Sequence, residues 1–213
     1  MTAQFPCQRP HTAPGISAAP RLAVHRVGDP GRAEVEAFIA TIYAQRYGAA
    51  LQQFAPVLVS LCDAEHGLVA AAGYRAASAP LFLERYLEAP VEALLACQAG
   101  AAKTPTRADI VEVGHLAAAR SGEGRRLIML LGPHLAEQGF EWVVSTLTTE
   151  LRQLFLRIGV TPLTLGLADP AVLGAEEARA WGSYYEHRPV VLAGHLPQAL
   201  QQLARRRAAR EAS

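Results

Sequence analysis

The chain carries little charge and few cysteines. Charged residues make up 18% of its 213 positions, and 20 basic against 19 acidic side chains leave a formal net charge of +1. A balance this close to neutrality does not suggest a nucleic-acid binder or an acidic interaction tail. The three cysteines are widely separated and include no C-x-x-C pair. Their pattern supports neither a zinc knuckle nor a disulfide framework, and we expect no bound metal.

Long hydrophobic segments are also missing. No run of residues approaches the roughly 18 apolar positions that a transmembrane span needs. Residues 1–20 contain four prolines and lack the apolar core of a signal peptide. We therefore expect 1–20 to be disordered or loosely packed, and we expect the protein to be cytoplasmic.

The apolar residues that are present follow the periods of strands and helices. They make up 51% of the chain, which is enough for the core of one domain spanning 21–213. Hairpin patterns and strand–helix–strand patterns both occur, which predicts an α+β fold with a mixed central sheet of about six or seven strands flanked by helices. The patterns predict strands at 22–27, 57–62, 68–74, 109–118, 142–147, 160–167 and 184–192, and helices at 30–47, 81–87, 91–98, 123–138, 150–158 and 197–210.

The segment from Ile110 to Arg126 is the most informative stretch of the chain. It reads as a buried strand, a short loop rich in Gly and Arg, and the start of a helix. A helix start offers free backbone N–H groups and a positive dipole end to an anion. The loop therefore predicts a site for a pyrophosphate or phosphopantetheine arm, formed by Arg120, Ser121, Gly122, Glu123, Gly124, Arg125 and Arg126.

Two residues of the same strand are able to transfer protons. Glu112 is a general base, or a residue that orients the substrate, or the partner of Arg75 or Arg107 in an ion pair. His115 is either a general base or a core histidine bonded to the backbone. Strict alternation places Glu112 and His115 on opposite faces of the strand, whereas a bulge at Gly114 would bring them to one face.

The order of elements and the loop after the fourth strand resemble the GNAT N-acyltransferase fold. Within that fold, Glu112-Val113-Gly114-His115 stands where acyl-homoserine lactone synthases carry Glu-x-x-Arg. Over 22–203 the chain resembles the family labelled thermostable hemolysin. The residues that carry this resemblance are L-F-L-E-R-Y-L at 81–87, P-V-E at 90–92, I-V-E-V-G-H-L-A at 110–117, L-T-T-E-L-R at 147–152, A-D-P at 168–170 and W-G-S-Y-Y at 181–185.

The resemblance implies roles for further residues. A bulge on the fourth strand would present backbone N–H groups near Gly114 and Leu116 to a thioester carbonyl as an oxyanion site. Glu84 shares a helical face with Glu88 and would bind an amino substrate, or both are solvated surface charges. The remaining candidates would line the substrate pocket or belong to ordinary sheet and core packing, and they are Ser145, Thr146, Trp181 and Tyr184.

Three functions remain open from the sequence. The first is an enzyme that moves an acyl group from acyl-CoA or acyl carrier protein to a small-molecule amine by direct attack, since no cysteine lies in 110–126. The second is a membrane-active toxin, as the family label suggests, and the third is a non-catalytic ligand-binding protein. The basic tail with Arg205, Arg206, Arg207 and Arg210 is either a solvated helix end or a docking site for an acidic partner such as acyl carrier protein.

Overall fold

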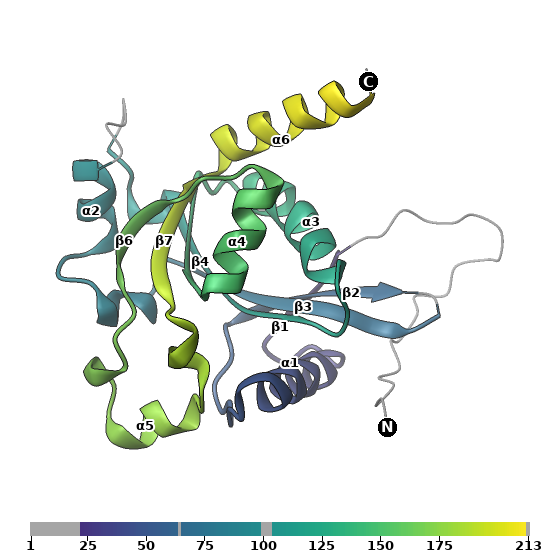
Figure 1. Ribbon diagram of the computed structural model, residues 1–213, viewed down its shortest axis with the longest axis vertical. Coiled ribbons are helices and arrows are strands. Elements are labelled where there is room, and N and C mark those ends of the chain that lie inside the picture. The colour runs from purple at the N-terminus through teal and green to yellow at the C-terminus, as the bar shows by residue number, and fades with distance from the viewer. Residues whose placement is uncertain (1–21, 64, 99–103, 212–213) are drawn as a thin grey trace.

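The computed structural model describes residues 22–63, 65–98 and 104–211, so the expected N-terminal segment 1–20 lies outside the described residues. Strands and helices alternate along the rest of the chain (Figure 1). The strands are β1 Leu22–Arg26, β2 Val57–Asp63, β3 Gly67–Ala76, β4 Ile110–Ala118, β5 Trp142–Leu147, β6 Leu163–Leu167 and β7 Val190–His195. The helices are α1 Arg32–Tyr47, α2 Val91–Gln98, α3 Glu123–Glu137, α4 Thr149–Ile158, α5 Ala175–Ala180 and α6 Leu196–Glu211, with short 3-10 helices η1 Leu83–Tyr86, η2 Arg107–Asp109, η3 Pro170–Val172 and η4 Tyr184–His187.

The seven strands form one mixed sheet in the order β1-β2-β3-β4-β5-β7-β6. All neighbouring strands are antiparallel except β4 and β5, which run parallel because α3 connects them as a crossover. The expected α+β class with a mixed sheet flanked by helices is therefore confirmed.

Helices cover both faces of this sheet (Figure 1). On one face α1 packs its buried Phe38 and Ile39 against β2, β3 and β4. On the other face α3 buries Leu127, Leu131 and Leu135 against the same strands. The helix stripes arise because apolar residues recur three and four positions apart, as on α3. The two layers together bury the sheet between them.

Among the described strands, the sheet opens at its one parallel pair, β4 and β5. Strands β4 and β5 pair through Ile110, Val111 and Glu112, opposite Trp142, Val143 and Val144. Beyond Glu112 the rest of β4 pairs with β3, while the rest of β5 pairs with β7. The two strands therefore diverge in the middle of the sheet, and this opening is where the site is built.

A bulge interrupts β4 directly beside the opening. Gly73 of β3 lies opposite Gly114 and Ala71 lies opposite Ala117, so β4 has one residue more than β3 over this stretch. His115 lies within it and has a φ of 53°, a left-handed conformation that His adopts more readily than most residues. The sequence prediction placed the irregularity at Gly114, but the left-handed residue is the histidine that follows.

Two local predictions were wrong. Within 81–87 the structure has the short 3-10 helix η1 at Leu83–Tyr86 rather than one longer helix, so Glu84 and Glu88 do not share a helical face. The stretch from 184 begins with η4 and becomes a strand only at Val190. Directly before α1, the Asp29 carboxylate accepts the Arg26 N–H at 2.7 Å and Gly31 holds the cap position.

Candidate active site

A cavity of about 530 Å³ lies at the opening, on the α1 side of the sheet. Its floor is the stretch of β4 from Glu112 to Leu116, and Thr146 of β5 borders the other strand. Aromatic side chains from α1, η1 and the segment after α5 form most of the wall, namely Tyr43, Phe54, Phe82, Tyr86, Trp181, Tyr184 and Tyr185. Sequence reasoning named Trp181 and Tyr184 as pocket residues but gave no cavity role to Tyr43, Phe54, Phe82 or Tyr86.

His115 lies on the cavity floor, packed between Phe54 and Tyr43, whose ring centroids are 5.6 and 6.4 Å away. Its Nδ1 is buried without a hydrogen-bond partner. Burial lowers its pKa from 6.5 to about 4, against a smaller opposing effect of the Gln53 backbone. The imidazole is therefore neutral near pH 7 and retains a lone pair that can accept a proton.

Gly73 provides the room that this histidine ring needs. A Cβ at Gly73 would lie 2.8 Å from the Cβ of Ala55 and 3.2 Å from Nδ1 of His115. Any larger residue at this position of β3 would push the ring out of its place. The bulge and the missing side chain opposite it thus turn His115 to the same face as Glu112, and both residues line the cavity.

Glu112 holds the start of η1 against the sheet. Its carboxylate accepts the backbone N–H of Phe82 at 2.9 Å and that of Leu83 at 3.1 Å. Burial raises the pKa of this carboxyl, while the two N–H groups and the charge of Arg75 act in the opposite direction. Neither expected ion-pair partner forms a salt bridge with it among the described residues, so the backbone of η1 is its main partner.

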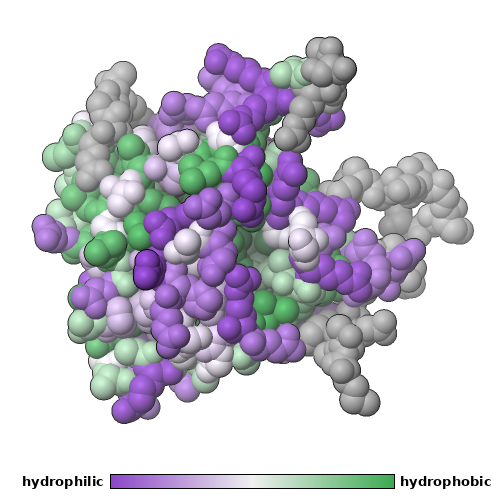
Figure 2. Space-filling view, viewed as in Figure 1, coloured by the Kyte–Doolittle hydropathy of each residue, from purple (hydrophilic) through white to green (hydrophobic). Residues whose placement is uncertain are grey.

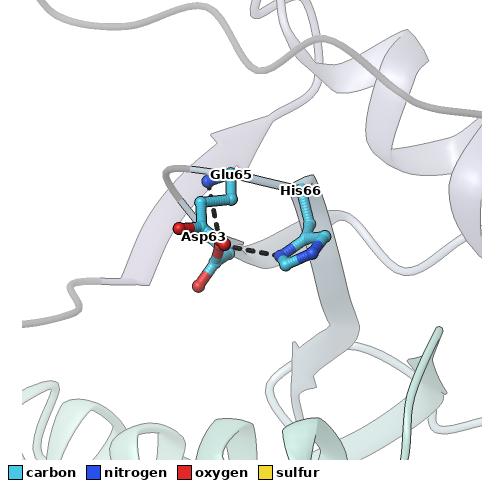
Figure 3. A group of neighbouring side chains, drawn as sticks. All are labelled: Asp63, Glu65 and His66. Carbon is cyan, nitrogen blue, oxygen red and sulfur yellow. Dashed lines mark hydrogen bonds and ion pairs between the residues drawn. The ribbon is translucent and has the colours of Figure 1, made fainter.

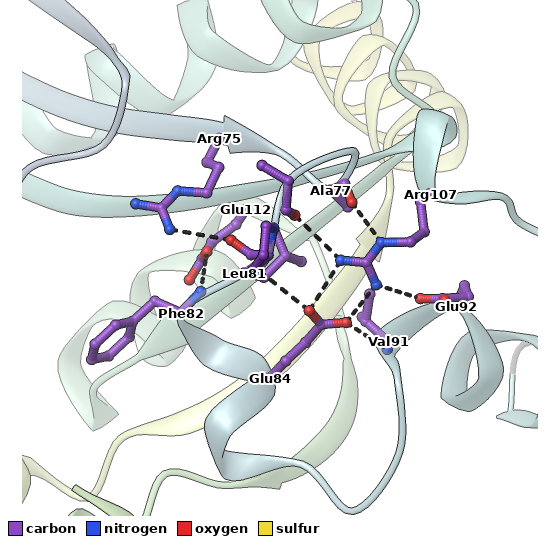
Figure 4. A network of polar contacts seen from close by, with 11 residues as sticks. Arg75, Ala77, Leu81, Phe82, Glu84, Val91, Glu92, Arg107 and Glu112 are labelled. Carbon is purple, nitrogen blue, oxygen red and sulfur yellow. Dashed lines mark hydrogen bonds and ion pairs between the residues drawn. The ribbon is translucent and has the colours of Figure 1, made fainter. Parts of the chain in front are cut away.

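The structure places Glu84 outside the cavity. Its carboxylate receives the Arg107 guanidinium at 2.6 and 3.0 Å, and Glu92 joins the same arginine at 2.8 Å (Figure 4). Arg107 holds the pKa of Glu84 below its usual range. These contacts hold η1 and α2 against η2. They give the Glu84 carboxylate a structural role and leave none of its oxygens free for a substrate.

Hydroxyl groups stand at the other side of the opening. The Tyr184 hydroxyl donates to the backbone carbonyl of Thr146 at 3.2 Å. Burial raises the pKa of Tyr184 well above its usual value, so the phenol keeps its proton. Tyr86 and Tyr185 share a hydrogen bond of 2.5 Å between their hydroxyls, which ties η1 to the segment after α5.

A second, smaller cavity of about 100 Å³ lies across the sheet from the first. It is enclosed by apolar side chains of α3, α4 and α6, including Leu131, Phe155 and Leu200. Ser145 lines this cavity rather than the larger one. Val113 and Leu116 line both cavities, so the two spaces adjoin the same stretch of β4 where it diverges from β5.

The residues of the predicted phosphate site form the turn into α3. Gly122 has a φ of 94° and holds the cap position, and α3 begins at Glu123. Arg120 and Arg125 are exposed, while Arg126 lies 3.6 Å from the Glu123 carboxylate. None of the described residues in this turn lines either cavity. Its role in cofactor binding stays a prediction.

One group of potential metal ligands occurs among the described residues, in the turn between β2 and β3 (Figure 3). It consists of Asp63, Glu65 and His66. The Asp63 carboxylate accepts the Glu65 N–H at 2.9 Å and bonds the His66 ring at 3.0 Å. These bonds are those of a closed turn, and we assign the group no metal.

A protein-family model for thermostable hemolysin matches residues 25–200. The chain belongs to the thermostable hemolysin family. The resemblance drawn from the sequence is thus confirmed for most of the chain. Among curated proteins, no sequence matches this family member.

Several solved structures share the fold of this hemolysin-family chain. TofI is 19% identical, with a TM-score of 0.59 over 86% of this chain and 96% of its own. FeeM, an N-acyl amino acid synthase from uncultured soil microbes, is 16% identical, with a TM-score of 0.55 over 87% and 96%. BjaI, a CoA-dependent acyl-homoserine lactone synthase, is 15% identical, with a TM-score of 0.58 over 88% and 89%. At these identities the likeness establishes the fold.

The family label raises the question of membrane action. Within the described part of the chain, every helix is too short or too polar to cross a membrane. Large exposed apolar residues such as Val27, Leu167 and Leu156 belong to three different parts of the chain. Figure 2 shows hydrophobic residues in several separate groups, with hydrophilic residues between them and over α6.

Proposed function

We propose that this protein is an N-acyltransferase that moves an acyl group from a thioester to a small-molecule amine. The observation that carries the proposal is the divergence of β4 from β5 above a cavity that contains a neutral histidine whose Nδ1 has no hydrogen-bond partner. Past Glu112 the side of β4 that faces β5 is outside the sheet pairing, which leaves backbone groups available to a ligand. Those near Gly114 and Leu116 are the proposed donors to the thioester oxyanion.

The cavity residues divide the proton transfers between them. His115 takes a proton from the ammonium of the acceptor, and the freed amine attacks the carbonyl carbon of the thioester. Collapse of the tetrahedral intermediate breaks the C–S bond and forms the amide. Of the three ammonium protons, one stays on the amide nitrogen, one ends on the thiol and one passes to water. Tyr184, which is protonated in the resting site, is the proposed donor to the leaving thiolate, and the ammonium proton counted on the thiol reprotonates the phenolate.

The two cavities suggest how the acyl donor lies. We place the amine in the larger, aromatic cavity and the acyl chain in the smaller, apolar one, with the thioester between Val113 and Leu116. The phosphates of coenzyme A, or of a carrier-protein phosphopantetheine arm, would bind the turn Arg120–Arg126 at the start of α3. Basic residues of α6 would face an acidic carrier protein. A cytoplasmic location stays a prediction.

Thiol release tests the proposal directly. Purified protein is incubated with acyl-CoA and acyl carrier thioesters of short, medium and long chains, with and without a panel of amines, and free thiol is followed with a thiol-reactive dye. We expect amine-dependent thiol release and a new amide by mass spectrometry. Absence of both release and thioester binding by calorimetry would contradict an acyltransferase. Leakage from liposomes at low protein concentration would instead support the toxin implied by the family label.

A further inference from the structure

Arg75 stands out among the charged residues of the larger cavity. It is the one cationic side chain among the described lining residues, beside the carboxylates of Glu112, Glu176 and Glu177. Its guanidinium makes a single hydrogen bond, from Nη1 to the Pro80 carbonyl at 3.2 Å. A guanidinium has five N–H donors in a planar fork, so most of its donor capacity is unused.

Other arginines of the described structure that lie near the cavity are already paired. Arg85 binds Glu177 at 2.7 Å, and Arg107 binds Glu84 and Glu92. No ion pair is found for Arg75 within the described residues, although the lining around it is acidic. The guanidinium nitrogens of Arg75 are not buried, so an anionic ligand can replace water at their free N–H groups and form a charge-assisted pair.

The position of Arg75 relative to Glu112 is fixed by the sheet. The two residues are direct partners across β3 and β4, and the charge of Arg75 lowers the pKa of Glu112. Figure 4 shows the two side chains next to each other, with Leu81 between them and the Arg107 network. A cation and an anion thus stand together at the cavity, each with lone pairs or donors to spare.

We propose that the larger cavity selects acceptors that carry a carboxylate, namely α-amino acids, and that Arg75 binds this carboxylate. This inference rests on the proposed function and names the class of amine that the site takes. The carboxylate pairs with the guanidinium fork of Arg75, while the ammonium is drawn to the acidic wall near Glu112. The amino nitrogen then lies over the stretch of β4 that ends at His115, where its proton is removed.

The apolar part of the wall fits the side chain of such an acceptor. Phe82, Trp181 and Tyr86 form a continuous aromatic surface around the mouth, with Phe82 and Trp181 centroids 5.9 Å apart. A hydrophobic or aromatic amino acid would cover this surface. The site therefore has a separate region for each of the three groups of an amino acid.

Matched substrates test the proposal. Thiol release is measured with L-phenylalanine against phenethylamine and with L-leucine against isopentylamine, pairs that differ only in the carboxylate. We expect kcat/KM to favour each amino acid by roughly 10- to 100-fold, the range of a charge-assisted pair. Arg75→Gln should raise KM for the amino acids by a similar factor and should raise KM for the plain amines much less. Arg75→Lys should lie between, because it keeps the charge and loses the fork.

A control variant and a binding measurement separate this inference from the proposed function. Arg157→Gln removes an exposed arginine of α4 that lines neither cavity, and it should change nothing. Calorimetry compares N-lauroyl-L-phenylalanine with N-lauroyl-phenethylamine on the wild type and on Arg75→Gln. Tighter binding of the carboxylate form, lost in Arg75→Gln, supports the inference even without turnover, in which case only the acyltransferase proposal fails. Equal binding of both compounds, or no binding of either, would overturn the inference.

Discussion

The two cavities that flank the opening between β4 and β5 differ in size and in chemistry. The larger one, of about 530 Å³, holds Arg75, Glu112, His115 and several tyrosines. The smaller one, of about 100 Å³, is lined almost entirely by aliphatic and aromatic carbon. Since the same two residues of β4 line both, a molecule with a polar head and an apolar tail could occupy the pair. An acyl thioester meeting an amine is such a combination.

The difference follows from how each face of the sheet is covered. On the α3 side, three helices place leucine and isoleucine stripes over the opening. On the α1 side, α1 stops short of β5, and the space is walled by η1 and by the segment around α5 and η4. Such short turns expose backbone N–H groups, which is why Glu112 can bind two of them. The polar character of the larger cavity thus depends on these irregular segments.

The largest effect is expected from the histidine of the polar cavity. His115→Asn should lower kcat by about 100- to 10,000-fold, as loss of a general base does, with little change in KM for the thioester. Asn tolerates the left-handed backbone at this position, so the bulge should persist. His134→Asn is the matched control, because His134 is also partly buried but lines neither cavity. Steady-state thiol release measures both, and wild-type kcat in His115→Asn would remove the base from the mechanism.

The same histidine should make stability depend on pH. Its folded pKa of about 4 lies below the ordinary 6.5, so the unfolded chain binds its proton first as the pH falls. The stabilisation from neutral His115 is therefore present above pH 6.5 and is lost as the pH falls through 6.5 toward 4, by at most about 3 kcal/mol. Urea unfolding of wild type and His115→Asn at several pH values isolates the effect, since the raised pKa of Glu112 acts with opposite sign in both. A pH-independent difference between them would contradict this assignment.

Glu112 has two possible roles in the larger cavity. It holds η1 against the sheet, or it acts on the substrate. Glu112→Gln keeps an acceptor for one of the Phe82 and Leu83 N–H groups and loses it for the other, which should destabilise the fold by about 1–3 kcal/mol. Urea unfolding measures this loss. The matched control is Glu92→Gln, whose partly exposed pair with Arg107 should contribute under about 1 kcal/mol. Unchanged stability with lost activity would assign Glu112 to the substrate instead of to η1.

The α+β fold with a mixed sheet could be predicted from the sequence because apolar residues recur at the spacing of a helix or a strand within each element. It also pointed to an irregular β4, since Glu112 and His115 could not otherwise share a face. The position of the irregularity was missed because glycine is the residue usually expected at positive φ. What places it at His115 is the space left by Gly73 on the neighbouring strand, a contact between positions about 40 apart that no local pattern shows.

Local sequence patterns also fail to show how charged residues pair. Glu84 looked available for a substrate because it was expected to share a helical face with Glu88, yet Arg107 reaches it from η2. Arg75 looked like a partner for Glu112, and the sheet does place them opposite each other, but the carboxylate turns to the backbone of η1. Pairing between distant segments decides which charges are satisfied, and the cation left without an ion pair, Arg75, is the one proposed to bind substrate.

The smallest effect is expected in the apolar cavity. Ala199 of α6 lines it, so Ala199→Phe should fill the space and lower kcat/KM for long-chain thioesters by about 10-fold, while short chains react as before. Ala204→Phe is the control on the same helix, because Ala204 is exposed and lines neither cavity. Thiol release across a series of chain lengths measures the change. If the dependence of thiol release on chain length is the same in Ala199→Phe as in wild type, the acyl chain does not occupy the smaller cavity. Acyl chain and amine would then both bind in the larger cavity.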